Sequence, residues 1–134
     1  MRLVDRPADF HGLGDVFIFG AGDGGLTVYR VLRKLPGVRI LGFIDNNKRG
    51  ELRGLPIIGL DDFLGRKGDP ARIVIASMYA FEIAAQLRRN GIVNFDNALP
   101  LINARSERLA ERGRRIRALI TIFVLFGSLI WMLA

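Results

Sequence analysis

The chain has 134 residues, which is enough for one domain and excludes a two-domain enzyme with separate cofactor and substrate halves. It carries 20 Lys and Arg residues against 13 Asp and Glu residues, so its formal net charge is +7. Residues 103–134 hold six of the basic and two of the acidic residues. This concentration near the C-terminus argues against a general nucleic-acid-binding surface.

The counts of cysteine and histidine limit the chemistry further. Cys is absent, which excludes disulfides, thiolate nucleophiles and metal sites with Cys ligands. The single histidine, His11, makes a Ser-His-Asp triad hard to build and a His-rich metal site impossible. Residues 1–14 carry charges and a proline, so we interpret them as an N-terminal extension and not as a secretory signal.

Apolar runs and helical spacing alternate over residues 15–102, which we predict to form one domain. Strands are expected near 16–19, 38–44, 72–76 and 92–95. Helices are expected at about 24–35, as one turn at 61–64, and from Ser77 as N-cap to Asn90. This alternation predicts an α/β fold with a small parallel sheet in the order 2-1-3-4 and helices on both faces.

The glycine-rich segment Gly20-Ala21-Gly22-Asp23-Gly24-Gly25 joins the first expected strand to the first expected helix. It fits the pattern G-x-G-x-x-G, and it has the strand–turn–helix context that this pattern needs. Glycine permits a tight turn at Gly20, close approach of a phosphate at Gly22 and close helix packing at Gly25. Amides at the helix N-terminus would then face the anion. The alternative is a glycine turn that only lets the helix pack on the sheet.

Several polar residues are expected beside this segment. Asp23 would repel a phosphate unless its side chain points away or caps the helix. Asp45 ends the second expected strand, where an acid accepts hydrogen bonds from a ribose. An Asx turn with Asn46 and Asn47 is an equally good interpretation of Asp45. Ser77 would lie on the opposite rim of the same crevice, after the third expected strand.

Four segments resemble the Rossmann-like nucleotide-binding domain of bacterial polysaccharide-biosynthesis proteins: FIFGAGDGG, LGFIDNN, GELRGLPIIG and IVIASMY. That group includes the N-terminal regions of membrane-bound nucleotide-sugar dehydratases and epimerases, and of sugar acetyltransferases. The resemblance covers roughly residues 15–98. It implies a nucleotide or nucleotide-sugar site at Gly20, Gly22, Gly25, Asp45 and Asn46. The catalytic half of those proteins, a short-chain-dehydrogenase domain or a left-handed β-helix, has no counterpart here.

The residues give little support for catalysis. A short-chain dehydrogenase needs Tyr and Lys four positions apart, so that the cation favours the phenolate. Tyr29 is followed at that spacing by Arg33, and we expect Tyr29 to face solvent. Asp61 and Asp62 are adjacent, so they point in different directions and are better explained by helix capping than by acid–base chemistry. We therefore expect a non-catalytic role.

The C-terminal residues 118–134 contain no charged side chain. As a helix they would be about 26 Å long, close to the hydrocarbon core of about 30 Å. Residues 103–117 carry six arginines, and basic residues flanking a span mark its cytoplasmic side. The sequence thus predicts a basic juxtamembrane linker helix at 103–117 and a single transmembrane helix at 118–134. The expected location is the cytoplasmic membrane, with the domain on the cytoplasmic side.

Three functions remain open from the sequence. The first is a membrane-anchored, non-catalytic module that binds NAD or a UDP-sugar in support of a membrane enzyme. Asp45 disfavours a 2′-phosphate on such a ligand, but the nearby Lys48 and Arg49 leave this choice open. The second is an accessory subunit of a larger membrane protein complex, with an empty nucleotide site and no cofactor. The third is one piece of a split dehydratase or epimerase. The expected partners are membrane lipid and a membrane complex, and no nucleic acid.

Overall fold

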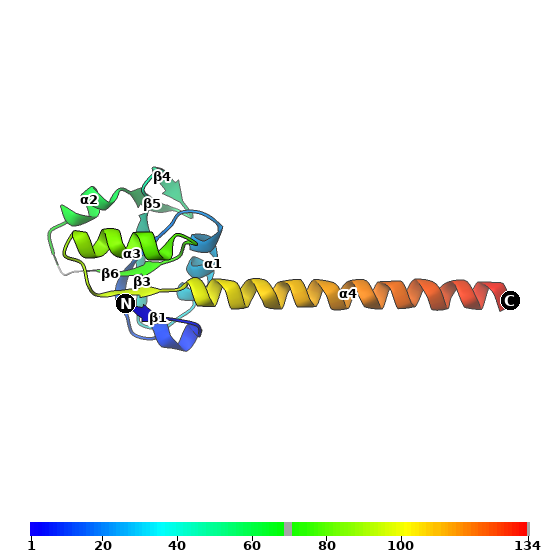
Figure 1. Cartoon of the computed structure of the whole chain (residues 1–134). Helices are drawn as coiled ribbons and strands as arrows, with labels where there is room; N and C mark the ends of the chain where they lie inside the picture. Colours follow the sequence, from blue (N-terminus) through cyan, green and yellow to red (C-terminus); the bar gives the residue numbers. More distant parts are fainter. Residues whose placement is uncertain (69–70, 134) are drawn as a thin grey trace. The chain divides into compact units, whose positions relative to one another are not determined.

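The computed structural model describes residues 1–68 and 71–133, and the side chains of these residues up to position 126. The chain divides into two compact units, Met1–Ile102 and Asn103–Ala134. The first unit contains the sheet and the helices that pack on it, and the second contains the greater part of a long helix (Figure 1).

The elements follow one another along the chain as alternating strands and helices. The strands are β1 (Arg2–Leu3), β2 (Gly14–Phe19), β3 (Val38–Ile44), β4 (Gly50–Leu52), β5 (Leu55–Ile58), β6 (Arg72–Ile75) and β7 (Phe95–Asn97). The helices are the short 3₁₀ helix η1 (Pro7–Phe10), α1 (Asp23–Leu32), α2 (Leu60–Leu64), α3 (Ala80–Arg89) and α4 (Leu99–Leu133).

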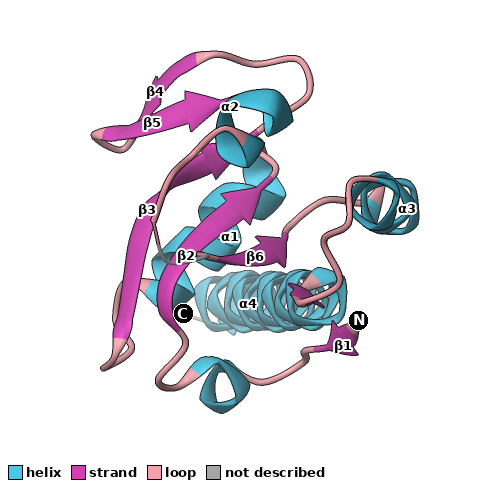
Figure 2. Cartoon of the chain, turned by 90° about the vertical axis from the view of Figure 1, so that its left-hand side faces the viewer, coloured by secondary structure: helices cyan, strands magenta, loops and turns pink. Residues whose placement is uncertain are grey.

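The strands form one sheet in the order β1-β7-β6-β2-β3-β5-β4 (Figure 2). Within it β3, β2, β6 and β7 are neighbours and parallel, which confirms the predicted order of the four main strands. The sheet as a whole is mixed, however, because β4 pairs antiparallel with β5. The turn between them, Arg53-Gly54, has positive φ at both residues, as the tight turns of hairpins require. The prediction of a purely parallel sheet is therefore wrong at this edge.

The fourth predicted strand, 92–95, lies too early in the sequence. Ile92 donates its N–H to the carbonyl of Leu87 at 3.0 Å, and Gly91 has a φ of +77°. This is the pattern in which a glycine with positive φ closes a helix. Residues 90–92 thus end α3, and the strand β7 begins at Phe95.

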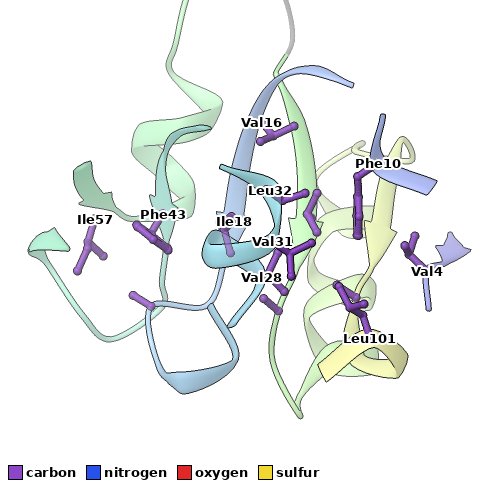
Figure 3. Close-up of a cluster of buried hydrophobic side chains, with 14 residues drawn as sticks. Val4, Phe10, Val16, Ile18, Val28, Val31, Leu32, Phe43, Ile57 and Leu101 are labelled. Atoms are coloured by element: carbon purple, nitrogen blue, oxygen red, sulfur yellow. The ribbon is translucent and has the colours of Figure 1, made fainter. Parts of the chain in front are cut away.

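The core lies in two layers, one on each face of the sheet. Along β2, Val16 and Ile18 belong to one buried cluster, and Phe17 and Phe19 belong to the other. Figure 3 shows the first cluster, in which the apolar face of α1 packs on the sheet through Val28, Val31 and Leu32. The second cluster is closed by α3 through Ala80, Ile83, Ala84 and Leu87. Helices therefore cover both faces, because successive strand residues point to opposite sides.

The predicted transmembrane helix is contradicted. Within the residues that the structure describes, no helix is long and apolar enough to cross a membrane. In α4 the arginine-rich stretch 103–117 precedes the uncharged residues, of which 118–126 are described with their side chains. These nine residues span about 13 Å, less than half of a hydrocarbon core of about 30 Å. The rest of the predicted span, 127–134, lies outside the described side chains. The cytoplasmic-membrane location that rested on this span is contradicted with it.

Candidate functional site

The glycine loop, residues 20–22, connects β2 to α1 at the carboxyl edge of the sheet. Gly20 has a φ of +120°, which side-chain-bearing residues rarely adopt, and its N–H donates to the carbonyl of Ile44 at 2.8 Å. A Cβ at this position would lie 2.7 Å from the carbonyl oxygen of Ala76. The tight turn predicted at Gly20 is thus present, and it requires glycine.

The glycines inside α1 serve close packing. A Cβ on Gly24 would lie 2.6 Å from the carbonyl oxygen of Ala76, and a Cβ on Gly25 would overlap the carbonyl oxygen of Gly20. The close packing predicted at Gly25 is therefore observed, and Gly24 shares it. The fold alone accounts for Gly20, Gly24 and Gly25.

Packing does not account for Gly22. It is the N-cap of α1 with an extended backbone, and a Cβ there would meet Lys48 Nζ at 3.9 Å as its one neighbour within 4 Å in the described part of the chain. The N–H of Leu26 donates to the carbonyl of Gly22 at 3.0 Å as the first bond of the helix. The amides of residues 22–25 precede that bond and so have no acceptor within the helix. Amides of this kind at a helix N-terminus suit a bound phosphate, and the Cβ position of Gly22 leaves room beside them.

The Asp45 carboxylate connects the end of β3 to the glycine loop. Its Oδ2 accepts a hydrogen bond from the N–H of Ala21 at 2.9 Å, and its Oδ1 accepts one from each N–H of Asn47 and Lys48 at 2.9 Å. The Asx-type turn is therefore present, and the same carboxylate also holds the loop. A carboxylate oxygen has about two acceptor positions, so Oδ2 retains one that a ribose hydroxyl can use.

The surroundings of Asp45 keep its carboxylate charged. Burial raises the pKa of Asp45, but the hydrogen bonds from Ala21, Asn47 and Lys48 and the positive charge of Lys48 outweigh burial and lower the pKa below 3.8. At neutral pH this group is thus an acceptor for hydroxyl groups and repels a phosphate carried on the ribose.

Lys48 lies at the glycine loop, whereas its position in the sequence relates it only to the ribose side of the ligand. Its Nζ donates to the carbonyl oxygen of Ala21 at 3.2 Å. Both backbone polar groups of Ala21 are consequently bonded to the segment that follows β3. The sequence shows a lysine three residues after Asp45. The direction of the lysine side chain depends on the turn that Asp45 organises, which the sequence does not reveal.

The side chains of two predicted site residues make no recorded hydrogen bond with the glycine loop in the described part of the chain. Asp23 is the first residue of α1 and exposed, and the structure records no hydrogen bond or ion pair for its carboxylate among the described residues. It therefore does not cap the helix. Asn46 exchanges two hydrogen bonds with Gln86 of α3, at 2.9 and 3.1 Å, so its amide joins the ends of β3 and α3.

The opposite rim is formed by the segment between β6 and α3. Ser77 is not the N-cap of α3, which begins at Ala80; its Oγ accepts a hydrogen bond from the N–H of Tyr79 at 3.1 Å. The Ser77 Cβ lies 3.6 Å from the position of a Cβ built on Gly20, so this rim adjoins the loop. The side chains of Met78, Tyr79 and Phe81 next to it are 76%, 64% and 70% exposed.

Tyr29 belongs to the core and not to this site. Its side chain is half-buried, and its ring centroid lies 6.1 Å from that of Phe43. The prediction that Tyr29 faces solvent is therefore wrong. The ring packs against the first buried cluster, on the same face of the sheet as α1.

Comparison with known proteins agrees with this geometry. Residues 15–77 match the family model described as the PglD N-terminal domain, which is a little under half of the chain. The matched range runs from the start of β2 to Ser77, and it includes the glycine loop, Asp45 and Lys48. No curated protein matches the chain in sequence.

Similar solved structures include an engineered D-amino acid dehydrogenase bound to NADP⁺, with a TM-score of 0.50 and 19% identity over 62% of this chain and 26% of that chain. A DAP dehydrogenase of C. glutamicum in complex with DAP has a TM-score of 0.48 and 19% identity over 59% of this chain and 24% of that chain. A Rex-family repressor has a TM-score of 0.45 and 21% identity over 78% of this chain and 62% of that chain. The chain thus spans about a quarter of the length of the two dehydrogenases. With the sheet order and the glycine loop, the family match and the likeness to the D-amino acid dehydrogenase identify a Rossmann-like fold.

Proposed function

We propose that this chain binds a nucleotide-sugar at the carboxyl edge of its sheet, with the phosphates on the glycine loop. The observation that carries the proposal is the open Cβ position at Gly22, the N-cap of α1, which has Lys48 Nζ 3.9 Å away. In parallel α/β sheets, ligands bind at this edge where the strand order reverses, and here that point lies between β2 and β6.

The choice of a nucleotide-sugar over other nucleotides is supported by the likeness to the PglD N-terminal domain. The resemblance to sugar acetyltransferases and nucleotide-sugar dehydratases points to the same ligand class. A dinucleotide such as NAD is the second ligand candidate, since the similar dehydrogenase binds NADP⁺. The charged Asp45 favours a ribose with free hydroxyls, which argues for NAD over its 2′-phosphorylated form.

The proposed role is binding, with the chemistry supplied by another domain or another chain. Tyr29, the tyrosine with a basic residue four positions later, packs with its ring against Phe43 in the core. The carboxylate of Asp45, beside the loop, is already engaged in hydrogen bonds. Asp45 accepts three backbone hydrogen bonds, which suits an organising role better than proton transfer.

An accessory role without a bound nucleotide is the second candidate function. It is favoured by α4, whose apolar side chains are widely exposed, including Leu119 at 65% and Phe123 at 81%. Exposed apolar surface of this kind marks an interaction site. In that case the glycine loop would serve only the close packing seen at Gly20, Gly24 and Gly25.

Calorimetric titration of the whole chain separates these candidates. UDP, a UDP-sugar, NAD and coenzyme A are titrated in turn. Heat of binding with UDP and the UDP-sugar at micromolar to low millimolar concentration supports the proposal. Absence of heat and of any thermal shift with all four ligands at millimolar concentration favours the accessory role.

A further inference from the structure

Lys48 occupies a specific place above the glycine loop. Its ammonium lies 3.2 Å from the carbonyl oxygen of Ala21 and 3.9 Å from the position of a Cβ on Gly22. Among the described residues, it is therefore the cation nearest to the open position at Gly22, where the first amides of α1 have no acceptor within the helix.

The backbone around Lys48 is fixed from two directions. Its N–H donates to Asp45 Oδ1 at 2.9 Å, and its carbonyl accepts a hydrogen bond from Arg49 Nη1 at 2.7 Å. The same Arg49 nitrogen also donates to the carbonyl of Asp45 at 2.7 Å. The start of the Lys48 side chain is thus held in place, although the side chain itself is exposed.

An anion at the loop needs a positive charge because two carboxylates border it. Asp45 Oδ2 lies 2.9 Å from the nitrogen of Ala21, and Asp23 is the first residue of α1. The partial positive charge of a helix N-terminus amounts to about half an elementary charge, which does not offset both. The ammonium of Lys48 supplies a full charge on the side where Gly22 is open.

The ammonium also has donors to spare. A lysine has three N–H donors, and the carbonyl of Ala21 is the acceptor that the structure records for Lys48 Nζ in the described part of the chain. Two donors therefore remain for phosphate oxygens.

We propose that Lys48 is the residue that makes this site specific for phosphorylated ligands, by contacting the diphosphate of a nucleotide bound at Gly22. This inference rests on the proposed function and assigns the ligand class as a nucleoside diphosphate ester. The contact involves phosphates at the loop and not a phosphate on the ribose, because the ribose position lies at the negatively charged Asp45.

The test is a series of uridine, UMP and UDP titrated into the whole chain. In the unmodified protein affinity rises along the series, since each phosphate adds a charge-assisted contact. In Lys48→Met the affinity for UDP falls roughly 10- to 150-fold, while that for uridine is unchanged. Lys48→Arg keeps the positive charge, so it should retain most of the increase in affinity from uridine to UDP.

Lys34→Met is the matched control. Lys34 is exposed and follows the carboxyl end of α1, opposite to the loop, so its loss removes the same charge without touching the site. If the affinity of Lys48→Met still rises steeply from uridine to UMP to UDP, the proposal for Lys48 is wrong and the proposed function stands. If the unmodified protein binds none of the three ligands, the proposed function itself fails.

Discussion

The carboxylate of Asp45 accepts a hydrogen bond from the backbone N–H of Ala21 at 2.9 Å, across 24 positions of sequence. An acid at the end of β3 therefore holds the loop that follows β2. From the sequence alone, Asp45 had two separate interpretations, a ribose acceptor and a local turn. The structure shows the local turn, made by Oδ1, and adds the loop contact made by Oδ2, while the ribose hydrogen bond stays a prediction.

Replacement of Asp45 by alanine is expected to affect stability as well as binding. It removes three hydrogen bonds to a charged acceptor, which are partly exposed and not additive, so the free energy of unfolding should fall by about 1–3 kcal/mol. Urea denaturation measures this loss. Asp5→Ala removes an exposed carboxylate whose ion pair with Arg6 is at the surface, and it should leave the midpoint unchanged. Equal midpoints for the two variants would show that Asp45 does not organise the loop.

Gly20 and Gly22 should respond differently to the addition of a methyl group. Gly20→Ala places a Cβ 2.7 Å from the carbonyl of Ala76 at a φ of +120°, so it should destabilise the fold by about 2 kcal/mol or more. Gly22→Ala has room and an extended backbone, so its thermal midpoint should be unchanged while binding of UDP is weakened. Gly22→Val should abolish that binding. Full affinity in Gly22→Val would exclude the phosphate position inferred here.

Asp96 should dominate the acid sensitivity of the fold. It is fully buried in β7 and bonded to Arg72 at 2.6 Å and to Arg2 at 2.9 Å. Burial raises the pKa of Asp96, but the hydrogen bonds and charges of Arg72 and Arg2 outweigh burial and lower it below 3.8. The unfolded chain therefore binds the proton first as pH falls. The stabilisation is complete above about pH 5 and is lost progressively as pH decreases through 3.8 toward the pKa of the folded state.

Asp96→Asn tests this pH dependence. It leaves Arg72 without its buried counter-charge, and the free energy of unfolding should fall by about 3–5 kcal/mol at neutral pH. The remaining stability should vary less between pH 5 and pH 3 than in the unmodified chain. Asp15→Asn breaks the exposed ion pair with Arg39 and is expected to change little. An unaltered acid profile in Asp96→Asn would mean that other carboxylates control acid unfolding.

The exposed apolar side chains of α4 are expected to make the chain associate. Phe123 and Leu119 are 81% and 65% exposed, and neighbouring side chains up to residue 126 are similarly accessible. Phe123→Lys combined with Leu119→Lys should reduce the mass measured by light scattering at micromolar concentration. Val93→Lys, at a side chain 75% exposed in the first unit, is the matched control and should leave the mass unchanged. A monomeric unmodified chain would contradict the prediction.

The sequence by itself determined the strands β2, β3 and β6, the order of the four main strands, the helices α1 and α3 and the turn at Gly20. The elements follow from local chemistry. Continuous apolar runs are typical of strands that are buried on both faces, and apolar residues at helical spacing form one buried face of a helix. Glycine alone easily adopts the φ at the turn. The strands β1, β4 and β5 have two to four residues, too few for a recognisable alternation. The sequence predicts the last main strand too early, at 92–95, because the apolar residues Ile92 and Val93 directly follow Gly91, the glycine that closes α3.

Only the tertiary structure decided how the polar residues act. The Asp45 carboxylate meets Ala21, Lys48 Nζ meets the carbonyl of the same residue, and Asn46 turns to Gln86. Sequence spacing cannot give these partners, because each contact joins different strands or a strand end and a helix. They depend on which strands are adjacent and on where each one ends. The same holds for Tyr29, whose side chain is half-buried and packs against Phe43 of β3.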